Sequence, residues 1–434
     1  MSQLITDMAI LAGEVPLEEV QDQLLSFYQK VRGETEGLAA SLSAEDMQLQ
    51  SMPDASPTKW HLAHTSWFFE TFVLASRLPG YQVFNPHFNH LFNSYYNSLG
   101  TPFSRSERGL ISRPDLGQIY EYRKAVDVGM QTLLSDYPVS PNLASLIQLG
   151  LNHEQQHQEL ILTDIKHALS VNPMALAYSD ALPEDEGYPL EPLRWLKIPR
   201  GFYGIGSDGN SFCFDNERPE HQQFVDEFRI ASRLITNGEY LEFIQDGGYE
   251  KHRLWLSDGW SLIQQNQYKS PCYWRRNESG WQQYSLHGSV TLNRSEPVYH
   301  LSFYEADAFA TWAGKRLPTE FEWEAAACHL RRPDQMAIAN FLEKRHFKPL
   351  QAQRGHTQFL GDLWEWTSSA YLPYRRFRTR ADAVGEYNGK FMCNQKVLRG
   401  GSFATPADHI RISYRNFFYP HQSWQFTGIR LAGD

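Results

Sequence analysis

The stretch from Asn142 to Leu169 most constrains the fold, because its apolar residues have helical spacing and it contains no proline. It carries His153 and His157. Residues at i and i+4 lie on one face of a helix, one turn apart, so the two rings can converge on one ion. Imidazole is a good ligand for iron, zinc and copper, and a buried ring needs partners for both nitrogens. The pair therefore predicts a metal site, with two core histidines bonded to carbonyls as the structural alternative.

The pair also matches the HExxH signature of zinc proteases, with Glu154 as the general base. That class of enzyme needs a third metal ligand further along the chain. The positions where that ligand would fall hold Thr163 and a residue near Ala177, and neither is suitable. A zinc hydrolase therefore stays only as a rival hypothesis, and we expect the third ligand elsewhere.

A second helix, rich in aromatic residues, is predicted to begin near Ser56-Pro57 and to end at Pro79-Gly80. It carries His61 and His64, which lie on nearly the same side of the helix. Either one could complete a three-histidine site that leaves open positions for substrate and oxygen. The residues alone do not decide between them, and a lone histidine on such a helix is more often structural.

Two further helices are predicted over Pro16 to Leu42 and Leu116 to Asp136. Four helices with one long connection, here Tyr81 to Leu116, make a bundle of the kind that builds metal sites from facing helices. A connection this long inside a compact domain is often functional.

The proline-rich, acidic stretch from Leu169 to Pro192 marks a boundary. Beyond it helical periodicity gives way to short strand-like runs with many Trp and Gly. Helical patterns interrupt these runs at Thr236–Gln245, Ser302–Ala313 and Thr319–Ala327. We therefore predict an α+β protein, with a helical bundle over residues 1–180 and a second domain over residues 181–434.

Composition excludes several function classes. A net charge of −10 without a basic run argues against a nucleic-acid partner. No apolar stretch approaches the length of a membrane span, and the N-terminus lacks the pattern of a signal peptide. The 4 cysteines are far apart and form no CxxC pair, which indicates free thiols and a cytoplasmic location.

Motifs in both halves then point to a known family. Four C-terminal motifs resemble the formylglycine-generating-enzyme (sulfatase-modifying) domain, a C-type-lectin-like fold: Arg316 to Glu324, Gly361 to Thr367, Leu398 to Ser402 and Gly428 to Ala432. The N-terminal motifs, Leu62-Ala63-His64 and the HExxH stretch, resemble the DinB-like four-helix bundle. The fusion is similar to the non-haem iron sulfoxide synthases of ergothioneine and ovothiol biosynthesis, which the stretch from Tyr387 to Asn394 also resembles.

Two departures narrow the resemblance. A formylglycine generator needs a close pair of cysteines for copper, whereas here only Cys393 lies in the C-terminal region. The ovothiol enzymes carry a C-terminal methyltransferase, whereas this chain ends at Asp434, directly after the lectin-like motif. The ergothioneine branch therefore fits better. It implies O2-dependent coupling of cysteine to the imidazole C2 of hercynine (N-alpha-trimethylhistidine), giving hercynylcysteine sulfoxide.

The resemblance implies that iron(II) is held by His64, His153 and His157. Such a site needs a proton donor near the oxygen, or the thiol is simply oxidised to a sulfinate. Tyrosine suits this task because it is neutral at pH 7. Tyr95 and Tyr96, in the long connection, are the candidates, with Tyr371 and Tyr374 as a second pair.

Substrate contacts are expected from both halves, and so at a site between the two domains. A quaternary ammonium is recognised by aromatic faces, and Phe417 and Phe418 would shape that pocket unless they are core residues. By resemblance, Asn416 and Gln156 bind polar atoms of hercynine. Arg105 and Arg108 could clamp the carboxylate of the thiol substrate, or form a surface pair with Glu107 or Asp54.

The absence of two charged residues near the C-terminus predicts which thiol is the substrate. Relatives that use gamma-glutamylcysteine have an acidic residue and an extra arginine where Phe418 and Gln422 stand here, which favours free cysteine. Gamma-glutamylcysteine, a selenosugar donor and a non-catalytic lectin-like binding module remain the alternatives. The resemblance also raises a structural calcium ion in the C-terminal domain, and the sequence does not predict the oligomeric state.

Overall fold

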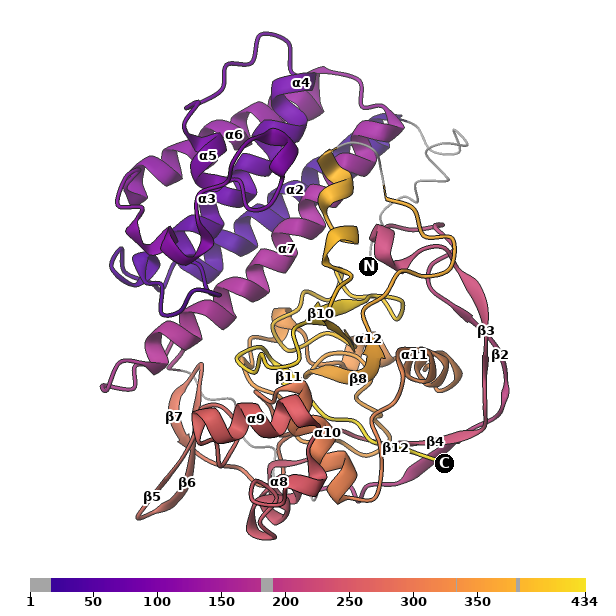
Figure 1. Cartoon of the computed structure of the whole chain (residues 1–434). Coiled ribbons are helices and arrows are strands. Elements are labelled where there is room, and N and C mark those ends of the chain that lie inside the picture. The colour runs from indigo at the N-terminus through magenta and orange to yellow at the C-terminus, as the bar shows by residue number, and fades with distance from the viewer. Residues whose placement is uncertain (1–16, 181–189, 333, 380–382) are drawn as a thin grey trace. The chain divides into compact units, whose positions relative to one another are not determined.

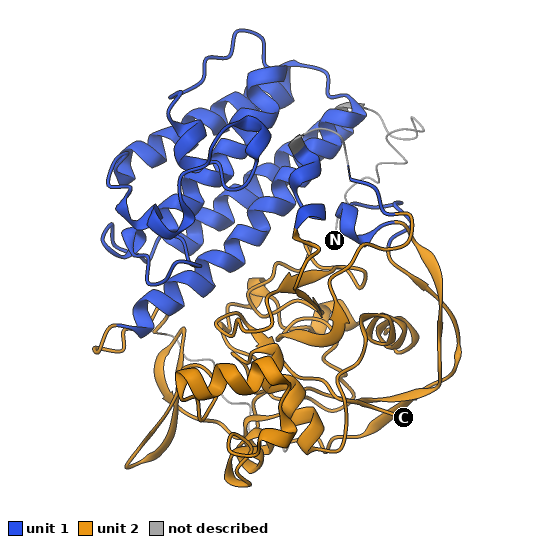
Figure 2. Ribbon diagram, in the orientation of Figure 1, with its two compact units in different colours: residues 1–171, 207–218, 377–390 blue, residues 172–206, 219–376, 391–434 orange. Residues whose placement is uncertain are grey.

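The computed structural model describes residues 17–180, 190–332, 334–379 and 383–434 (Figure 1). The chain divides into two compact units, each assembled from separate segments (Figure 2). Unit 1 comprises residues 1–171, 207–218 and 377–390, and unit 2 comprises residues 172–206, 219–376 and 391–434. Two segments from beyond residue 200, here called the late segments, thus belong with the N-terminal unit. The linear division at residue 180 stays a prediction.

Unit 1 is a helical bundle, as predicted (Figure 1). Helices α2 and α3 each pack against both α6 and α7. The second helix continues beyond α3 as a π-helical turn, η2, and a last turn, α4. The bundle helices are α2 (Leu17–Ala39), α3 (Thr58–Phe68), η2 (Phe69–Leu74), α4 (Ala75–Arg77), α6 (Leu116–Asp136) and α7 (Pro141–Ser170).

Local sequence signals explain where these helices begin. The side chain of Asp115 accepts a hydrogen bond from the Gln118 amide, and Gln118 returns one to the Asp115 amide, which is a capping box at the start of α6. Ser140 caps α7 through the Leu143 amide, with Pro141 in the first turn. Every residue of α3 is buried, because this helix lies against two neighbours.

The connection between α4 and α6 contains short helical turns, although the sequence indicated only irregular structure. These turns are α5 (Phe88–Phe92), η3 (Asn97–Leu99) and η4 (Arg105–Leu110). The late segments that join unit 1 include η5 (Asp215–Glu217) and η8 (Ala383–Glu386). Within the described residues, no helix is both long and apolar enough to span a membrane.

Unit 2 is a mixture of small sheets and helices. Its strands form sheets of order β1-β4-β12, β10-β9-β8-β11, β2-β3 and β5-β6-β7, antiparallel except for the β8–β11 pair. The strands are β1 (Trp195–Ile198), β2 (Gly201–Ile205), β3 (His221–Val225), β4 (Phe228–Ala231), β5 (Trp274–Asn277), β6 (Gly280–Ser285), β7 (Gly288–Thr291), β8 (Trp364–Ala370), β9 (Lys396–Arg399), β10 (Asn416–Phe418), β11 (Thr427–Gly428) and β12 (Ala432–Gly433).

The three predicted helical patches are confirmed as α8 (Asn237–Gln245), α10 (Phe303–Trp312) and α11 (Glu320–His329), and a short α12 covers Gln335–Ile338. Helix α9 (Ser257–Asn266) was not predicted. Only Gly259 and Ile263 of α9 are buried, so it has no continuous apolar stripe from which a helix can be recognised.

The C-terminal motifs meet in the core of unit 2. Arg430 pairs with Glu365 through two contacts, Nε–Oε2 at 2.7 Å and Nη2–Oε1 at 2.8 Å. The indole N–H of Trp323 donates to the same carboxylate at 2.6 Å. Arg430 and Glu365 are both 0% exposed, so water does not solvate either charge. Each charge is instead balanced by the opposite charge of its partner. These motifs therefore hold strands and helix α11 together.

We predict that Arg430→Met lowers the free energy of unfolding by roughly 3 kcal/mol or more, because it leaves the Glu365 carboxylate buried without its partner. Urea denaturation followed by tryptophan fluorescence measures this loss. Adding Glu365→Gln should recover part of it. Arg316 is the matched control: it also pairs with a carboxylate, but its side chain is 38% exposed, so Arg316→Met should cost less than about 1 kcal/mol. Equal losses in the two variants would contradict this account.

Candidate metal centre

Three histidines from two helices of unit 1 converge. His64 comes from α3, and His153 and His157 come from α7. One nitrogen of each ring lies within 4.8 Å of the others, and the rings are 0%, 2% and 7% exposed. Among the described residues, these three form the one group of histidine, cysteine and carboxylate side chains close enough to share an ion. Their assignment as iron ligands stays a prediction, but the structure brings together the three residues that the resemblance indicated.

The donor set fits a divalent transition-metal ion. The Nε2 atoms of His64 and His153 are 3.2 Å apart. Two ligands at right angles on a metal, each about 2.1 Å from it, lie about 3 Å apart. Burial lowers the pKa of His153 to about 3 and lowers the pKa values of His64 and His157 well below their usual range, with the neighbouring rings adding to the effect. All three are therefore neutral at pH 7, which is the form that binds metals.

The structure separates His64 from His61, which the sequence left open. The Nδ1–H of His64 donates to the carbonyl of Phe92 at 2.5 Å, which leaves Nε2 for an ion. His61 instead lies behind the group, with its Nδ1 2.8 Å from Nδ1 of His157 and its Nε2 3.1 Å from a carboxylate oxygen of Asp164. His64 is thus the third member of the group, and His61 is its neighbour.

Glu154 does not serve the metal group. Its two carboxylate oxygens accept hydrogen bonds from Arg32 at 3.0 Å and from Arg123 at 3.2 Å, and all three side chains are almost fully buried. Burial by itself raises the pKa of Glu154, but the two guanidinium groups outweigh it and hold the pKa below its usual value. A hydrolase of the HExxH type needs this carboxylate as its base, so the geometry does not favour the zinc-hydrolase hypothesis.

A buried arginine lies close to the three histidines. The guanidinium of Arg108 is 3.4 Å from the ring centroid of Trp60, and Trp60 stacks on His64 at 4.5 Å. Arg108 is 3% exposed and donates to the hydroxyls of Ser56 at 2.8 Å and Ser94 at 3.1 Å. It forms no ion pair with a described residue, and burial lowers its pKa well below the usual value. Asp164 acts on its charge from beyond ion-pair distance and partly opposes this lowering.

The other predicted arginine is different. Arg105 is exposed and donates to the backbone carbonyl of Asp54. Its predicted role as a clamp stays untested, but unlike Arg108 it has water as an alternative partner.

Tyr95 and Tyr96 lie in the loop that follows α5, here called the tyrosine loop. The rings of Tyr95 and Tyr96 stack at 4.7 Å, and Tyr96 also packs against Trp67 at 5.7 Å and Phe72 at 5.0 Å. Tyr96 is 0% exposed, and its hydroxyl interacts with that of Tyr95, which raises the pKa of Tyr96 further. Burial raises the pKa of both tyrosines, so both remain protonated at neutral pH.

Residues from the late segments complete this part of unit 1. The hydroxyl of Tyr387 donates to Oε1 of Gln156. The Tyr387 ring meets His153 edge to face at 5.7 Å and stacks on Phe214 at 5.4 Å. Sequence reasoning missed both Tyr387 and Phe214 as site residues. The stretch from Tyr387 was noted only as similar to the family, and nothing local predicts that it reaches α7.

The late segment is also fastened to the tyrosine loop. The carboxylate of Glu386 accepts from the amides of Asn97 and Ser98, both at 3.1 Å, and from the Ser98 hydroxyl at 2.6 Å. Lys390 pairs with Glu386 at 2.9 Å and donates to the carbonyl of Tyr95. Burial alone raises the pKa of Glu386, but the Ser98 hydroxyl, Lys390 and the two amides hold the pKa at about 2.

The remaining predicted residues lie in unit 2, on β10. Asn416, Phe417 and Phe418 are half-buried there, and the Phe417 ring stacks on Tyr371 at 4.1 Å. The amide of Phe417 donates to Oδ1 of Asn416 at 2.9 Å. Their contacts with hercynine stay a prediction. A structural calcium ion likewise stays a prediction.

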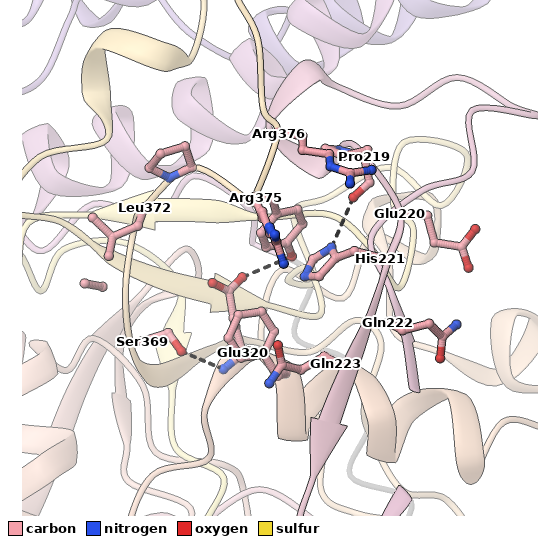
Figure 3. Close-up of a pocket in the computed structure, with 14 residues that line it drawn as sticks. Pro219, Glu220, His221, Gln222, Gln223, Glu320, Ser369, Leu372, Arg375 and Arg376 are labelled. Atoms are coloured by element: carbon pink, nitrogen blue, oxygen red, sulfur yellow. Dashed lines mark hydrogen bonds between the residues drawn. The ribbon is translucent and has the colours of Figure 1, made fainter. Parts of the chain in front are cut away.

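A cavity of about 680 Å³ lies in unit 2, and its lining does not include Asn416, Phe417 or Phe418. Figure 3 shows Glu320, His221 and Arg375 around it, with the Nδ1 of His221 bonded to the carbonyl of Pro219 at 3.1 Å. Of the predicted residues, it includes only Tyr374 from the second tyrosine pair. The hydroxyl of Tyr374 accepts from Arg399 at 3.0 Å and donates to Glu320 at 3.3 Å, so it is held in a buried ion-pair network.

Comparison with known proteins agrees with this architecture. The description of the DinB superfamily matches residues 28–161, and that of the sulfatase-modifying factor enzyme 1-like domain matches residues 192–434. A hercynine oxygenase from Mycolicibacterium smegmatis is 32% identical over 417 residues, covering 90% of this chain and 94% of the relative. The chain belongs to the hercynine oxygenase family. Another member, from Mycobacterium tuberculosis, is 32% identical over 436 residues, which covers 95% of this chain and 99% of the relative.

The formylglycine-generating enzyme of Bos taurus is a more distant relative. It is 26% identical over 290 residues, covering 57% of this chain and 76% of that enzyme. The fused family and the α+β fold class predicted from sequence are thus confirmed.

We predict that Glu386→Gln speeds hydrogen exchange at the Asn97 and Ser98 amides severalfold at pH 7, because a neutral amide is a weaker acceptor than a carboxylate. Mass spectrometry of the exchanging protein measures this. The pKa of Glu386 is lower in the folded chain than the ordinary value of about 4.3, so the contribution is complete above that value and is lost as pH falls toward 2. The wild-type advantage should therefore be constant from pH 6 to 8. A difference that disappears within that range would contradict this origin.

Proposed function

We propose that this chain is a non-haem iron(II) oxygenase that couples cysteine to hercynine. The observation that carries the proposal is the buried group of His64, His153 and His157 in a chain whose full-length relatives are named hercynine oxygenases. Three neutral imidazoles are the donor set of a site with open coordination positions. When bound there, iron(II) would supply the means to reduce O2 and bind the thiol sulfur.

The reaction balances without a further reductant. Cysteine and hercynine each lose one hydrogen, from the S–H and from C2 of the imidazole, and a C–S bond forms between those atoms. One oxygen atom of O2 ends on sulfur as the sulfoxide, and the other leaves as water with the two hydrogens. The four electrons that O2 takes up come from forming the C–S bond and from oxidising sulfur.

Gln156 is suited to hold hercynine. Its Oε1 accepts from Tyr387, which orients the amide next to His157, and an amide NH2 group is a suitable donor to polar atoms of hercynine. The carboxylate and the unprotonated imidazole nitrogen of hercynine both accept such hydrogen bonds. Tyr387 thus fixes which end of the amide is presented.

Arg108 is suited to hold the carboxylate of the thiol substrate. No described carboxylate lies within ion-pair distance of its buried charge, although Asp164 acts on it from further away, and Trp60 packs against the guanidinium beside His64. A free amino acid bound through this group would place its short side chain near the three histidines.

Tyr96 and Tyr95 are suited to deliver a proton. Burial keeps both phenols protonated, and the interaction of the Tyr96 hydroxyl with Tyr95 couples the two candidate donors. The late segment fastens this loop through Glu386, so the hydroxyls are positioned before substrate binds.

The deciding experiment measures O2 consumption by the iron-loaded, full-length protein with hercynine and cysteine, and identifies products by mass spectrometry. We expect uptake that needs both substrates and yields hercynylcysteine sulfoxide. Gamma-glutamylcysteine and a selenosugar in place of cysteine identify the donor. If the protein binds hercynine but consumes no O2 with cysteine, gamma-glutamylcysteine or the selenosugar, the proposal is overturned and a binding module is supported. Turnover with zinc, abolished by Glu154→Gln, would support the hydrolase.

We predict that Tyr96→Phe diverts turnover, so that the ratio of coupled sulfoxide to cysteine sulfinate falls by about 10-fold or more, because general acid catalysis contributes at least that much. Product analysis by mass spectrometry measures the ratio. Tyr95→Phe shows whether the stacked neighbour shares the role. Tyr374→Phe tests the rival pair and should leave the ratio unchanged, since its hydroxyl is engaged by Arg399 and Glu320. A diverted ratio in that variant alone would assign the proton donor to the rival pair.

We predict that Arg108→Met raises the KM for cysteine by about 10- to 100-fold, the value of hydrogen bonds to a charged group. The KM for hercynine should change by less than about threefold. The exposed Arg105, changed to Met, is the matched control and should have the smaller effect. An equal rise for both substrates would indicate damage to the site as a whole and would contradict carboxylate recognition by Arg108.

A further inference from the structure

Behind the three histidines, a second set of buried polar groups runs outward from His157. Asp164 follows His157 by two helical turns on α7 and so lies on the same face. His61 comes from α3, three residues before His64. His61 and Asp164 are 2% and 5% exposed, so their hydrogen bonds are made with protein and not with bulk water.

The carboxylate of Asp164 sets the direction of these hydrogen bonds. Oδ2 of Asp164 accepts from the Ser56 amide at 2.8 Å and lies 3.1 Å from Nε2 of His61. An ionised carboxylate only accepts hydrogen bonds, so the proton of this contact is on Nε2 of His61. With that proton in place, neutral His61 presents a lone pair on Nδ1.

The tautomer of His61 determines which atom donates in its contact with His157. Nδ1 of His61 and Nδ1 of His157 are 2.8 Å apart, and one of them must donate. Since His61 offers a lone pair there, His157 carries its proton on Nδ1. Nε2 of His157 is then the unprotonated nitrogen, and it is available to bind a metal.

The other two rings lack such a chain. Nδ1 of His64 donates directly to the Phe92 carbonyl, and Nδ1 of His153 has no hydrogen-bond partner among the residues that the structure describes. Of the three rings, His157 is therefore the one linked to a carboxylate, through His61 and two hydrogen bonds. Carboxylates behind metal-binding histidines fix the ring tautomer and raise its basicity as a ligand.

We propose that His61 and Asp164 are positioning residues that set the tautomer of His157, so that its Nε2 is presented to the metal. His61 then acts through His157 and is not itself a ligand. This inference rests on the proposed metal centre and deepens it, but it does not depend on which thiol is the substrate. It also gives a reason for two histidines one turn apart on α3: His64 faces the ion and His61 supports the opposite helix.

The test measures binding of Co²⁺, as an oxygen-stable substitute for iron(II), to the full-length apoprotein by visible absorption titration. Loss of an outer hydrogen-bond partner typically weakens metal affinity by about 10- to 100-fold. We expect a loss in this range for His61→Phe, which removes the acceptor for His157, and a loss toward the lower end for Asp164→Asn, which removes the charge. The spectrum of bound Co²⁺ should also shift in both variants.

His61→Asn is the conservative rescue. Its side-chain oxygen can occupy the place of the imidazole Nδ1 and accept from His157, but the link to Asp164 is cut, so the affinity should return to about the level of Asp164→Asn. Asp164→Asn should then cause little further loss, because the link to the carboxylate is already cut. His167→Gln is the matched control: His167 is on the same helix and bonds to the hydroxyl of Ser51 at 2.6 Å.

A measurement on the unaltered protein covers the case in which a variant does not fold. Two-bond ¹H–¹⁵N spectra of the ¹⁵N-histidine-labelled apoprotein distinguish a proton on Nδ1 from one on Nε2. We expect Nδ1–H for His157 and Nε2–H for His61. An Nε2–H tautomer for His157, or Co²⁺ affinities equal to wild type in both His61→Phe and Asp164→Asn, would overturn the inference but leave the metal centre intact. A wild-type protein that binds neither Co²⁺ nor iron(II) would instead overturn the proposed function, and this inference with it.

Discussion

The organisation of the bundle depends on one buried carboxylate. Glu154 of α7 is held by Arg32 of α2 and Arg123 of α6. The same two arginines reach α3, where Arg32 donates to the Ser66 hydroxyl at 2.8 Å and Arg123 to the Leu62 carbonyl at 3.0 Å. A single network thus ties four helices together and fixes the rotation of α7 about its axis. Because neighbouring residues of a helix point in different directions, fixing Glu154 turns His153 and His157 toward α3.

Burial then gives the histidines their chemistry. Removal from water disfavours the charged imidazolium, so the rings are neutral and able to bind an ion at physiological pH. The same burial makes every ring nitrogen a group that needs a partner. Phe92 and His61 provide such partners on the outer side of His64 and His157, which orients their Nε2 atoms inward. The proposed metal site and the packing of the bundle are therefore parts of one arrangement.

The chain also returns to the bundle late in its sequence. Tyr387 reaches Gln156, and Glu386 binds the loop that carries Tyr95 and Tyr96. These residues do not come from a local helical pattern, and they join unit 1 although their neighbours in sequence belong to unit 2. A substitution in this late segment should thus affect the groups proposed to deliver the proton and to hold hercynine.

The sequence alone determined what depends on local spacing: the bundle helices, the pairing of His153 with His157 on one face, and the motifs that identify the family. Periodicity and caps act within a few residues, so they can be read without knowing the packing. The residues alone left His61 and His64 open, and family resemblance favoured His64. The tertiary structure brings His64 to the pair, places His61 next to His157, pairs Glu154 with two arginines of the bundle, and joins Tyr387 to Gln156 across 231 positions of sequence. These contacts follow from how helices rotate and pack against one another, and that information is not contained in any single stretch of the chain.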